Sequence, residues 1–290
     1  LRDGVPVAAF MSTRTLLLSL WHWHPSVLLG CAALIAGYVV LLRGRWTARA
    51  LLFGLGMAVL LVALLSPLHE LGDRYLFSAH MLQHLLLLLI VPPLLLLGLP
   101  SAAIERLLRA PGVAQIERAL GAPLLAWAIG LGAMWLWHLP ALYNLALRNE
   151  WVHILEHLFF LVSAVIFWWP IFTSAERSRL HPLGAIAYLF AGMIVSSLLG
   201  MILTFAEPGL YPAYVNPPDP FGLLPLLWGE WGLTPAVDQQ VGGLLMWVPG
   251  GMVYLLGIIM LLARWYAMPE DDALGLAEVS ETGLLTSNGG

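Results

Sequence analysis

The chain has 290 residues, of which 60% are hydrophobic and only 10% are charged. Soluble domains carry about 25% charged residues, so this composition indicates a polytopic membrane protein and excludes a soluble domain with a large core. The formal net charge of -4 comes with no basic stripe, and we therefore expect no nucleic-acid partner.

Two residue counts narrow the class further. All 13 cationic residues are arginine, which excludes a seven-helix retinal protein because its Schiff base needs a lysine. Cys31 is the single cysteine. An intramolecular disulfide and a Cys-x-x-Cys metal clip are therefore excluded as well.

Apolar stretches of roughly 20 residues, long enough to cross a bilayer, recur seven times along the chain. They lie near 26–42, 50–69, 75–98, 122–144, 151–173, 183–206 and 239–265. We predict an all-α polytopic membrane protein, with a seven-helix transmembrane bundle over 21–266. Pro92 and Pro93 should kink the third span.

The two ends of the chain are expected to lie outside the bundle. Residues 1–20 form an N-terminal extension, in which Met11 resembles a native start, and the first span is then an uncleaved anchor. Residues 267–290 are polar, acidic and rich in glycine and serine, so we expect a disordered acidic tail.

The distribution of arginines along the chain predicts how the bundle is oriented in the membrane. Nine arginines share one side of the predicted membrane: Arg43, Arg45, Arg49, Arg106, Arg109, Arg118, Arg177, Arg179 and Arg264. The other side has four, namely Arg2, Arg14, Arg74 and Arg148. The positive-inside rule places the N-terminus outside and the C-terminus in the cytoplasm. The loop 207–238 then lies outside, as a cap at the membrane interface.

Eight of the nine histidines map to the outer end of the predicted spans. They are His22, His24, His69, His80, His84, His138, His153 and His157. Ionisable groups inside a bilayer are costly and usually functional, and imidazole binds transition metals. The pattern therefore predicts a metal or cofactor site in the outer leaflet.

Two histidine pairs carry most of this prediction. His80 and His84 are four residues apart, as are His153 and His157, so each pair shares one helix face. Glu156 completes an H-x-x-E-H string, in which zinc peptidases use the glutamate as a general base. The structural alternatives are hydrogen bonds to neighbouring helices and a buried Glu–His hydrogen bond.

Other residues near the same depth are candidates for completing or tuning the site. His138 is a possible third ligand or proton carrier, and Met81 is a soft thioether ligand, although methionine in an apolar helix is more often a packing residue. Asp238 either orients a ligand histidine or caps a helix. His22 and His24 form an exposed H-x-H that could capture a metal.

Several ordered motifs resemble the CtaG family of cytochrome c oxidase assembly factors, from about Trp21 to Tyr266. They are Ser66-Pro-Leu-His, His80-Met-Leu-Gln-His84, Pro92-Pro93 through Gly98-Leu-Pro100, Trp137-His-Leu-Pro140, His153 to His157, Phe167-Trp-Trp-Pro170 and Asp238-Gln-Gln240 with Met246-Trp247. The resemblance implies a seven-span protein that helps to mature a haem–copper oxidase by supplying copper. Its expected partners are oxidase subunits and a periplasmic copper donor.

The leading hypothesis is a copper-binding assembly factor that needs no turnover. Its expected ligands are His80, His84, His153 and His157, completed by His138 or Met81 and tuned by Glu156 and Asp238. A second hypothesis is a membrane zinc hydrolase in which Glu156 activates water. The third is a haem or quinone protein with histidine axial ligands.

Overall fold

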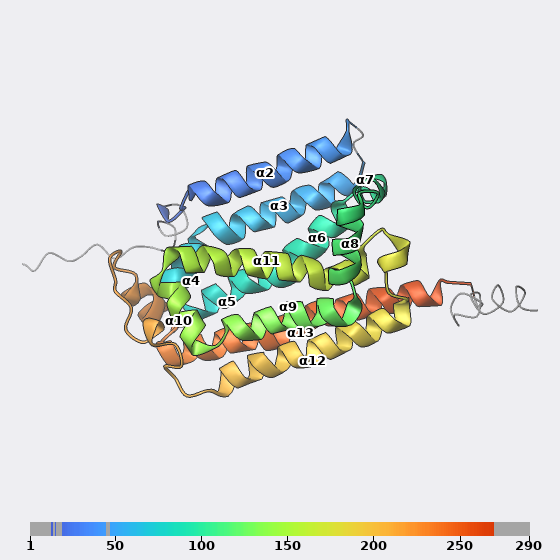
Figure 1. The fold of residues 1–290 in the computed structure, drawn as a ribbon. Coiled ribbons are helices and arrows are strands. Elements are labelled where there is room, and N and C mark those ends of the chain that lie inside the picture. Colours follow the sequence, from blue (N-terminus) through green and yellow to red (C-terminus); the bar gives the residue numbers. More distant parts are fainter. Residues whose placement is uncertain (1–12, 14, 16–18, 45–46, 270–290) are drawn as a thin grey trace, which may run out of the picture.

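The fold is a bundle of helices that run roughly along one common direction (Figure 1). We describe it from a computed structural model, for residues 13, 15, 19–44 and 47–269. No strand occurs among these residues, which confirms the predicted all-α class. The predicted extension (1–20) and acidic tail (267–290) fall largely outside the described residues.

Long helices alternate with short ones. The long elements are α2 (Pro25–Leu42), α3 (Arg49–Leu65), α9 (Pro123–Trp137), α11 (Glu150–Phe172), α12 (Pro182–Phe205), α13 (Pro235–Tyr266) and the continuous run of α5 (Phe77–Leu85), η1 (Leu86–Ile90) and α6 (Val91–Gly98). The short elements are α4 (Pro67–Arg74), α7 (Ser101–Leu107), α8 (Pro111–Leu120), α10 (Pro140–Arg148), η2 (Glu176–Ser178), η3 (Pro212–Tyr214) and η4 (Pro225–Glu230).

Five of the described helical segments are long and apolar enough to cross a membrane. The number rises to seven if two bent pairs each count as one span: α3 with α4, bent by 44°, and α8 with α9, bent by 69°. The protein is therefore a membrane protein with several apolar helices, while seven crossings and their orientation remain predictions.

Two predicted spans are not single helices over their predicted lengths, and proline explains both breaks. In the second, the helix ends at Leu65, before the predicted span end near 69, because Ser66 caps a new helix that begins at Pro67. In the fourth, the helix ends at Trp137, before the predicted span end near 144, because α10 begins at Pro140. Proline lacks an N–H donor and is favoured in the first turn of a helix, so each one starts a new segment.

Pro92 leaves a different mark on the third span. The helix continues through it, but a π-helical turn, η1, immediately precedes it. Proline cannot donate to the carbonyl four residues earlier, which is that of Leu88. The indole Nε1 of Trp168 on α11 donates to that carbonyl over 2.9 Å, so the freed acceptor joins the two helices.

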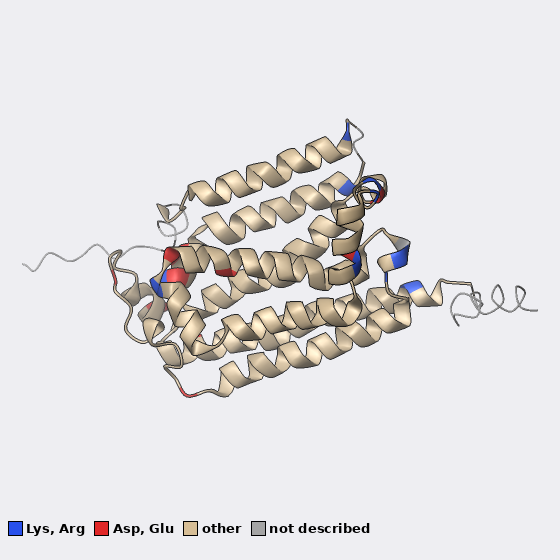
Figure 2. Ribbon diagram, viewed as in Figure 1, with Lys and Arg blue, Asp and Glu red and all other residues tan. Residues whose placement is uncertain are grey.

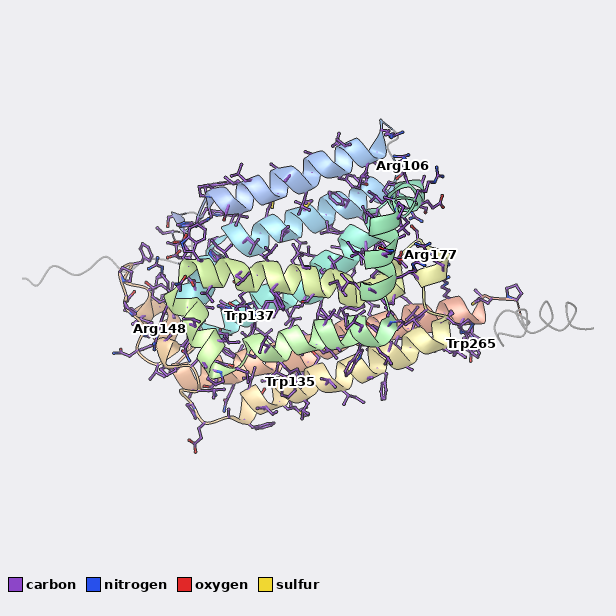
Figure 3. All side chains as sticks on the ribbon, in the orientation of Figure 1. Arg106, Trp135, Trp137, Arg148, Arg177 and Trp265 are labelled. Atoms are coloured by element: carbon purple, nitrogen blue, oxygen red, sulfur yellow. The ribbon has the colours of Figure 1, made fainter. Side chains whose placement is uncertain are left out.

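Charged side chains gather at the two ends of the bundle (Figure 2). Arg106 and Arg177 lie at one end, and Arg148 lies at the other (Figure 3). The first is called the arginine end below, and the second, where α4, α10 and the 206–234 loop lie, is called the histidine end (Figure 1). Helix α2 lies at the edge of the bundle and packs on α3, where the rings of Tyr38 and Phe53 stack 3.7 Å apart.

Candidate metal centre

The two predicted histidine pairs face each other near the histidine end. Helix α5 carries His80 and His84, and α11 carries His153 and His157. The ring centroids of His80 and His153 lie 5.3 Å apart, and those of His84 and His157 lie 5.7 Å apart. Four imidazoles from two helices thus share one volume inside the bundle.

Two groups of three side chains in this volume have the spacing of metal ligands. One is His80, His84 and His157, and the other is His80, His153 and Glu156. Within each group the potential ligand atoms lie within 4.8 Å of one another. The Nε2 atom of His84 also lies 3.8 Å from Oε1 of Glu156, too far for a hydrogen bond but within reach of a shared ion.

Three of the rings are held by their Nδ1 atoms. His80 Nδ1 lies 3.3 Å from the carbonyl of Gly72, His138 Nδ1 lies 2.6 Å from that of Met134, and His153 Nδ1 lies 3.2 Å from a carboxylate oxygen of Asp73. An acceptor at Nδ1 favours the tautomer with its proton there, which leaves the lone pair on Nε2. Metal-binding histidines are oriented in the same way by carbonyl or carboxylate partners.

The Nε2 atoms of the cluster histidines, and the carboxylate of Glu156, have no hydrogen-bond partners among the described residues. The Nε2 atom is buried and makes no hydrogen bond in five histidines: His80, His84, His138, His153 and His157. Both carboxylate oxygens of Glu156 are likewise buried without a partner. His80 and Glu156 are 0% exposed. Burying polar atoms without partners costs several kcal/mol each in an apolar medium, whereas a cation with nitrogen and oxygen ligands would satisfy them together. The donor set therefore fits a transition metal.

The remaining predicted site residues lie around this cluster. The ring of His138 is 5.6 Å from that of His84, although His138 belongs to neither group of three. Met81 is fully buried and lines a cavity of about 30 Å³ together with His84. Asp238 contacts backbone groups and not a histidine ring. Its carboxylate accepts hydrogen bonds from the N–H groups of Phe77 and Ser78, where α5 begins. It thus caps the helix that carries His80.

Sequence reasoning missed the residues that orient the rings. Gly72 and Asp73 on α4 contact His80 and His153, and Tyr214, from the loop, donates to the Gly72 carbonyl over 2.7 Å. Tyr211 donates to the carbonyl of His138 over 2.7 Å. For the two tyrosines, the sequence offers one signal, the high Tyr, Pro and Gly content of the loop 207–238, which by itself predicts only an interfacial cap.

Burial keeps these two loop tyrosines protonated. It raises the pKa of Tyr211 and of Tyr214 well above the ordinary value for a phenol. Both hydroxyls therefore remain hydrogen-bond donors across the physiological pH range. The loop thus holds the carbonyls of Gly72 and His138 with neutral hydrogen bonds.

A large cavity reaches the cluster from one side. Its volume is about 1140 Å³, and it lies between α2 and α11, with His153 and His157 in its wall. His80, His84 and Glu156 do not line it. The cluster is thus open to the cavity at His153 and His157 and closed at His80, His84 and Glu156.

The comparisons with known proteins place the chain in a family. It is 26% identical over 270 residues to an uncharacterized protein of Mycobacterium leprae (strain TN), and 25% identical over 268 residues to uncharacterized proteins of Mycobacterium bovis and Mycobacterium tuberculosis. Each match covers 84% of this chain but only 39% of the relative, so the chain spans about two fifths of their length.

No solved structure matches the chain. The sequence model of the cytochrome c oxidase caa3 assembly factor family, however, matches residues 32–268. That range holds both histidine pairs, Glu156 and nearly all of the helical bundle, as the sequence motifs predicted. The chain therefore belongs to the cytochrome c oxidase caa3 assembly factor family.

Proposed function

We propose that this protein binds copper in the buried histidine cluster and supplies it to a haem–copper cytochrome c oxidase during assembly, at the bacterial inner membrane. The observation that carries the proposal is the set of unpartnered Nε2 atoms on His80, His84, His138, His153 and His157, together with the unpartnered carboxylate of Glu156. Copper is the cargo here, and the family supplies the oxidase as its destination.

The chemistry of the cluster suits a transition metal that must later leave. Neutral imidazoles bind copper and zinc well, and Glu156 offsets part of the ion's charge inside an apolar bundle. His80 belongs to both groups of three. An ion can therefore exchange some of its ligands while His80 keeps hold of it, which favours transfer over permanent storage.

The zinc-hydrolase alternative is less well supported by the geometry. A catalytic zinc keeps an open position for water, and its general base must reach that water. Glu156 is completely buried and does not line the large cavity. A substrate entering from that cavity meets His153 and His157 before it can meet the glutamate, so Glu156 is better placed to tune a bound ion.

Copper retention tests the proposal directly. Replacing His80 and His157 together by Ala removes a ligand from each helix and leaves only one histidine of each facing pair, so the variant should lose its copper during gel filtration. Copper per protein is measured by elemental analysis on monodisperse, detergent-purified protein. His181→Ala, which removes the one histidine at the arginine end, is the matched control. Full copper content in the double variant would refute the proposed site.

Glu156→Gln separates the assembly factor from the hydrolase. The substitution keeps the shape of the side chain and removes its charge, so copper should bind roughly 10–100-fold more weakly, while some oxidase maturation persists. The two measurements are copper affinity of the purified variant and oxidase activity of cells that carry it. A variant that binds zinc normally, binds no copper and loses all cellular function would support the hydrolase.

A further inference from the structure

The large cavity connects the histidine cluster to polar side chains at the histidine end. His22, His24, Glu150, His69 and Asp73 line it, together with His153. Its walls farther along α2 and α11 are apolar, with residues such as Leu34, Leu158 and Val162. The histidines and carboxylates of its lining are thus confined to one end of the cavity, and they lead toward the cluster.

The mouth of this polar part holds an imidazole and a carboxylate in contact. His24 Nε2 lies 2.6 Å from Oε1 of Glu150, and the ring of His22 stacks 5.8 Å from that of His24. The three side chains come from two segments, the stretch before α2 and the first turn of α11. Metal–nitrogen and metal–oxygen bonds are about 2 Å long, so a single ion can contact both His24 and Glu150 after a small adjustment.

Imidazole rings continue from the cavity into the cluster at nearly even spacing. The ring of His69 is 5.5 Å from that of His153, His153 is 5.3 Å from His80, and His80 is 4.2 Å from His84. Steps of this length allow an ion to gain its next ligand before it has lost the last one. The carboxylate of Asp73 lies beside the first step, 3.2 Å from His153 Nδ1.

Gln83 gives His69 a role different from that of the cluster histidines. Its amide nitrogen donates both to the carbonyl of Ala63 and to Nδ1 of His69, over 2.9 and 3.0 Å. A donor at Nδ1 leaves the proton of a neutral His69 on Nε2. His69 is therefore a poorer resting ligand than His153, and an ion that reaches it is released readily to the next ring.

We propose that His22, His24 and Glu150 form a second, weaker metal site at the mouth of the cavity, which captures copper ions and passes them by way of His69 and His153 to the buried cluster. This inference rests on the proposed function for its destination, but the capture site itself is independent of the cluster. It predicts that the mouth residues set the rate of loading and not the amount of copper that is finally held.

The test compares loading kinetics with final copper content, using Cu⁺ alone under anaerobic conditions and the full chain in detergent. His22→Ala with His24→Ala should slow loading by about tenfold or more, the scale of a lost local concentration effect, and leave the final copper content unchanged. His181→Ala, at the arginine end, should load at the original rate. Unchanged thermal unfolding confirms that each variant is folded.

A second arm measures the mouth site without the cluster. The variant lacking His80 and His157 should still bind Cu⁺ weakly at equilibrium, although it loses the ion on gel filtration, and adding the His22 and His24 substitutions should weaken that binding further. An unaltered loading rate, or weak binding that the His22 and His24 substitutions leave unchanged, would overturn the capture site while leaving the cluster intact. An unmodified protein that retains no copper, yet shows weak binding dependent on His22 and His24, would instead refute the proposed function alone.

Discussion

At the scale of single residues, the oxygen atoms that contact Nδ1 indicate that these histidines can act as metal ligands. A histidine that only packs inside a helix bundle uses both ring nitrogens in hydrogen bonds or leaves one facing water. Here His80, His138 and His153 are each held at Nδ1 by a backbone or carboxylate oxygen, and each keeps an unpartnered, buried Nε2. This arrangement fixes the direction of the lone pair before any ion arrives.

Gly72 shows how closely the backbone must approach for this to happen. A Cβ added there would lie 2.9 Å from both Cα and N of His80, so Gly72→Ala must push α4 and α5 apart. We expect a loss of about 1–3 kcal/mol in the free energy of unfolding and weaker copper binding, because the carbonyl that orients His80 moves away. Thermal unfolding and a competitive copper titration measure the two effects.

Gly54→Ala is the matched control for this prediction. Gly54 lies inside α3, and an added Cβ would meet no atom within 4 Å. It should leave copper affinity unchanged and stabilise the helix by up to about 1 kcal/mol. If Gly72→Ala behaved like Gly54→Ala in the copper titration, the Gly72 carbonyl would have no part in orienting His80.

At the scale of elements, two helices with irregular turns carry the site. The run from α5 to α6 is interrupted by η1, and α11 contains Pro170. The hydrogen bond from Trp168 to the Leu88 carbonyl locks the two together about one helical turn from the proline that frees this acceptor. This hydrogen bond helps to fix the register between the α5–α6 run and α11, on which the facing of the histidine pairs depends.

Trp168→Phe tests this lock. The change removes the indole donor and leaves the Leu88 carbonyl unpaired, at an expected cost of about 1–3 kcal/mol in unfolding free energy. In a Pro92→Ala background the restored N–H at position 92 can satisfy that carbonyl, so the same substitution should cost less. Chemical or thermal unfolding of the four proteins in this cycle measures the difference. Equal costs in both backgrounds would show that Trp168 contributes packing alone.

The sequence predicted features within single helices, but it missed where some helices end and how different segments contact one another. Hydropathy located the long apolar helices, and i, i+4 spacing predicted that each histidine pair would share a face, because both depend on local sequence. The ends near Leu65 and Trp137 were missed, since proline at the start of a new helix overrode an unbroken apolar pattern. The contacts of Asp73 with His153 and of Tyr214 with Gly72 join segments far apart in the chain, and the contact of Gly72 with His80 crosses from one helix to the next, so no single-helix pattern could reveal them.

At the scale of the whole molecule, the bundle separates two kinds of chemistry. Most arginines lie at one end (Figure 2), while the candidate ligand histidines and the 206–234 loop lie toward the other. Under the proposed function, and with the orientation that the positive-inside rule predicts, copper would reach the cluster from the outer side of the membrane and be held within the bilayer. The oxidase could then receive it without its release into water.

The environment of the bound metal tests the central claim most directly. X-ray absorption at the copper edge of the loaded, detergent-purified protein should show imidazole nitrogens at about 2.0 Å, the usual metal–imidazole distance, with the multiple-scattering pattern of at least two histidine rings. That signal should disappear when His80 and His157 are both replaced by Ala. A copper site dominated by sulfur, or an imidazole signal unchanged in the double variant, would contradict a buried histidine cluster as the copper carrier.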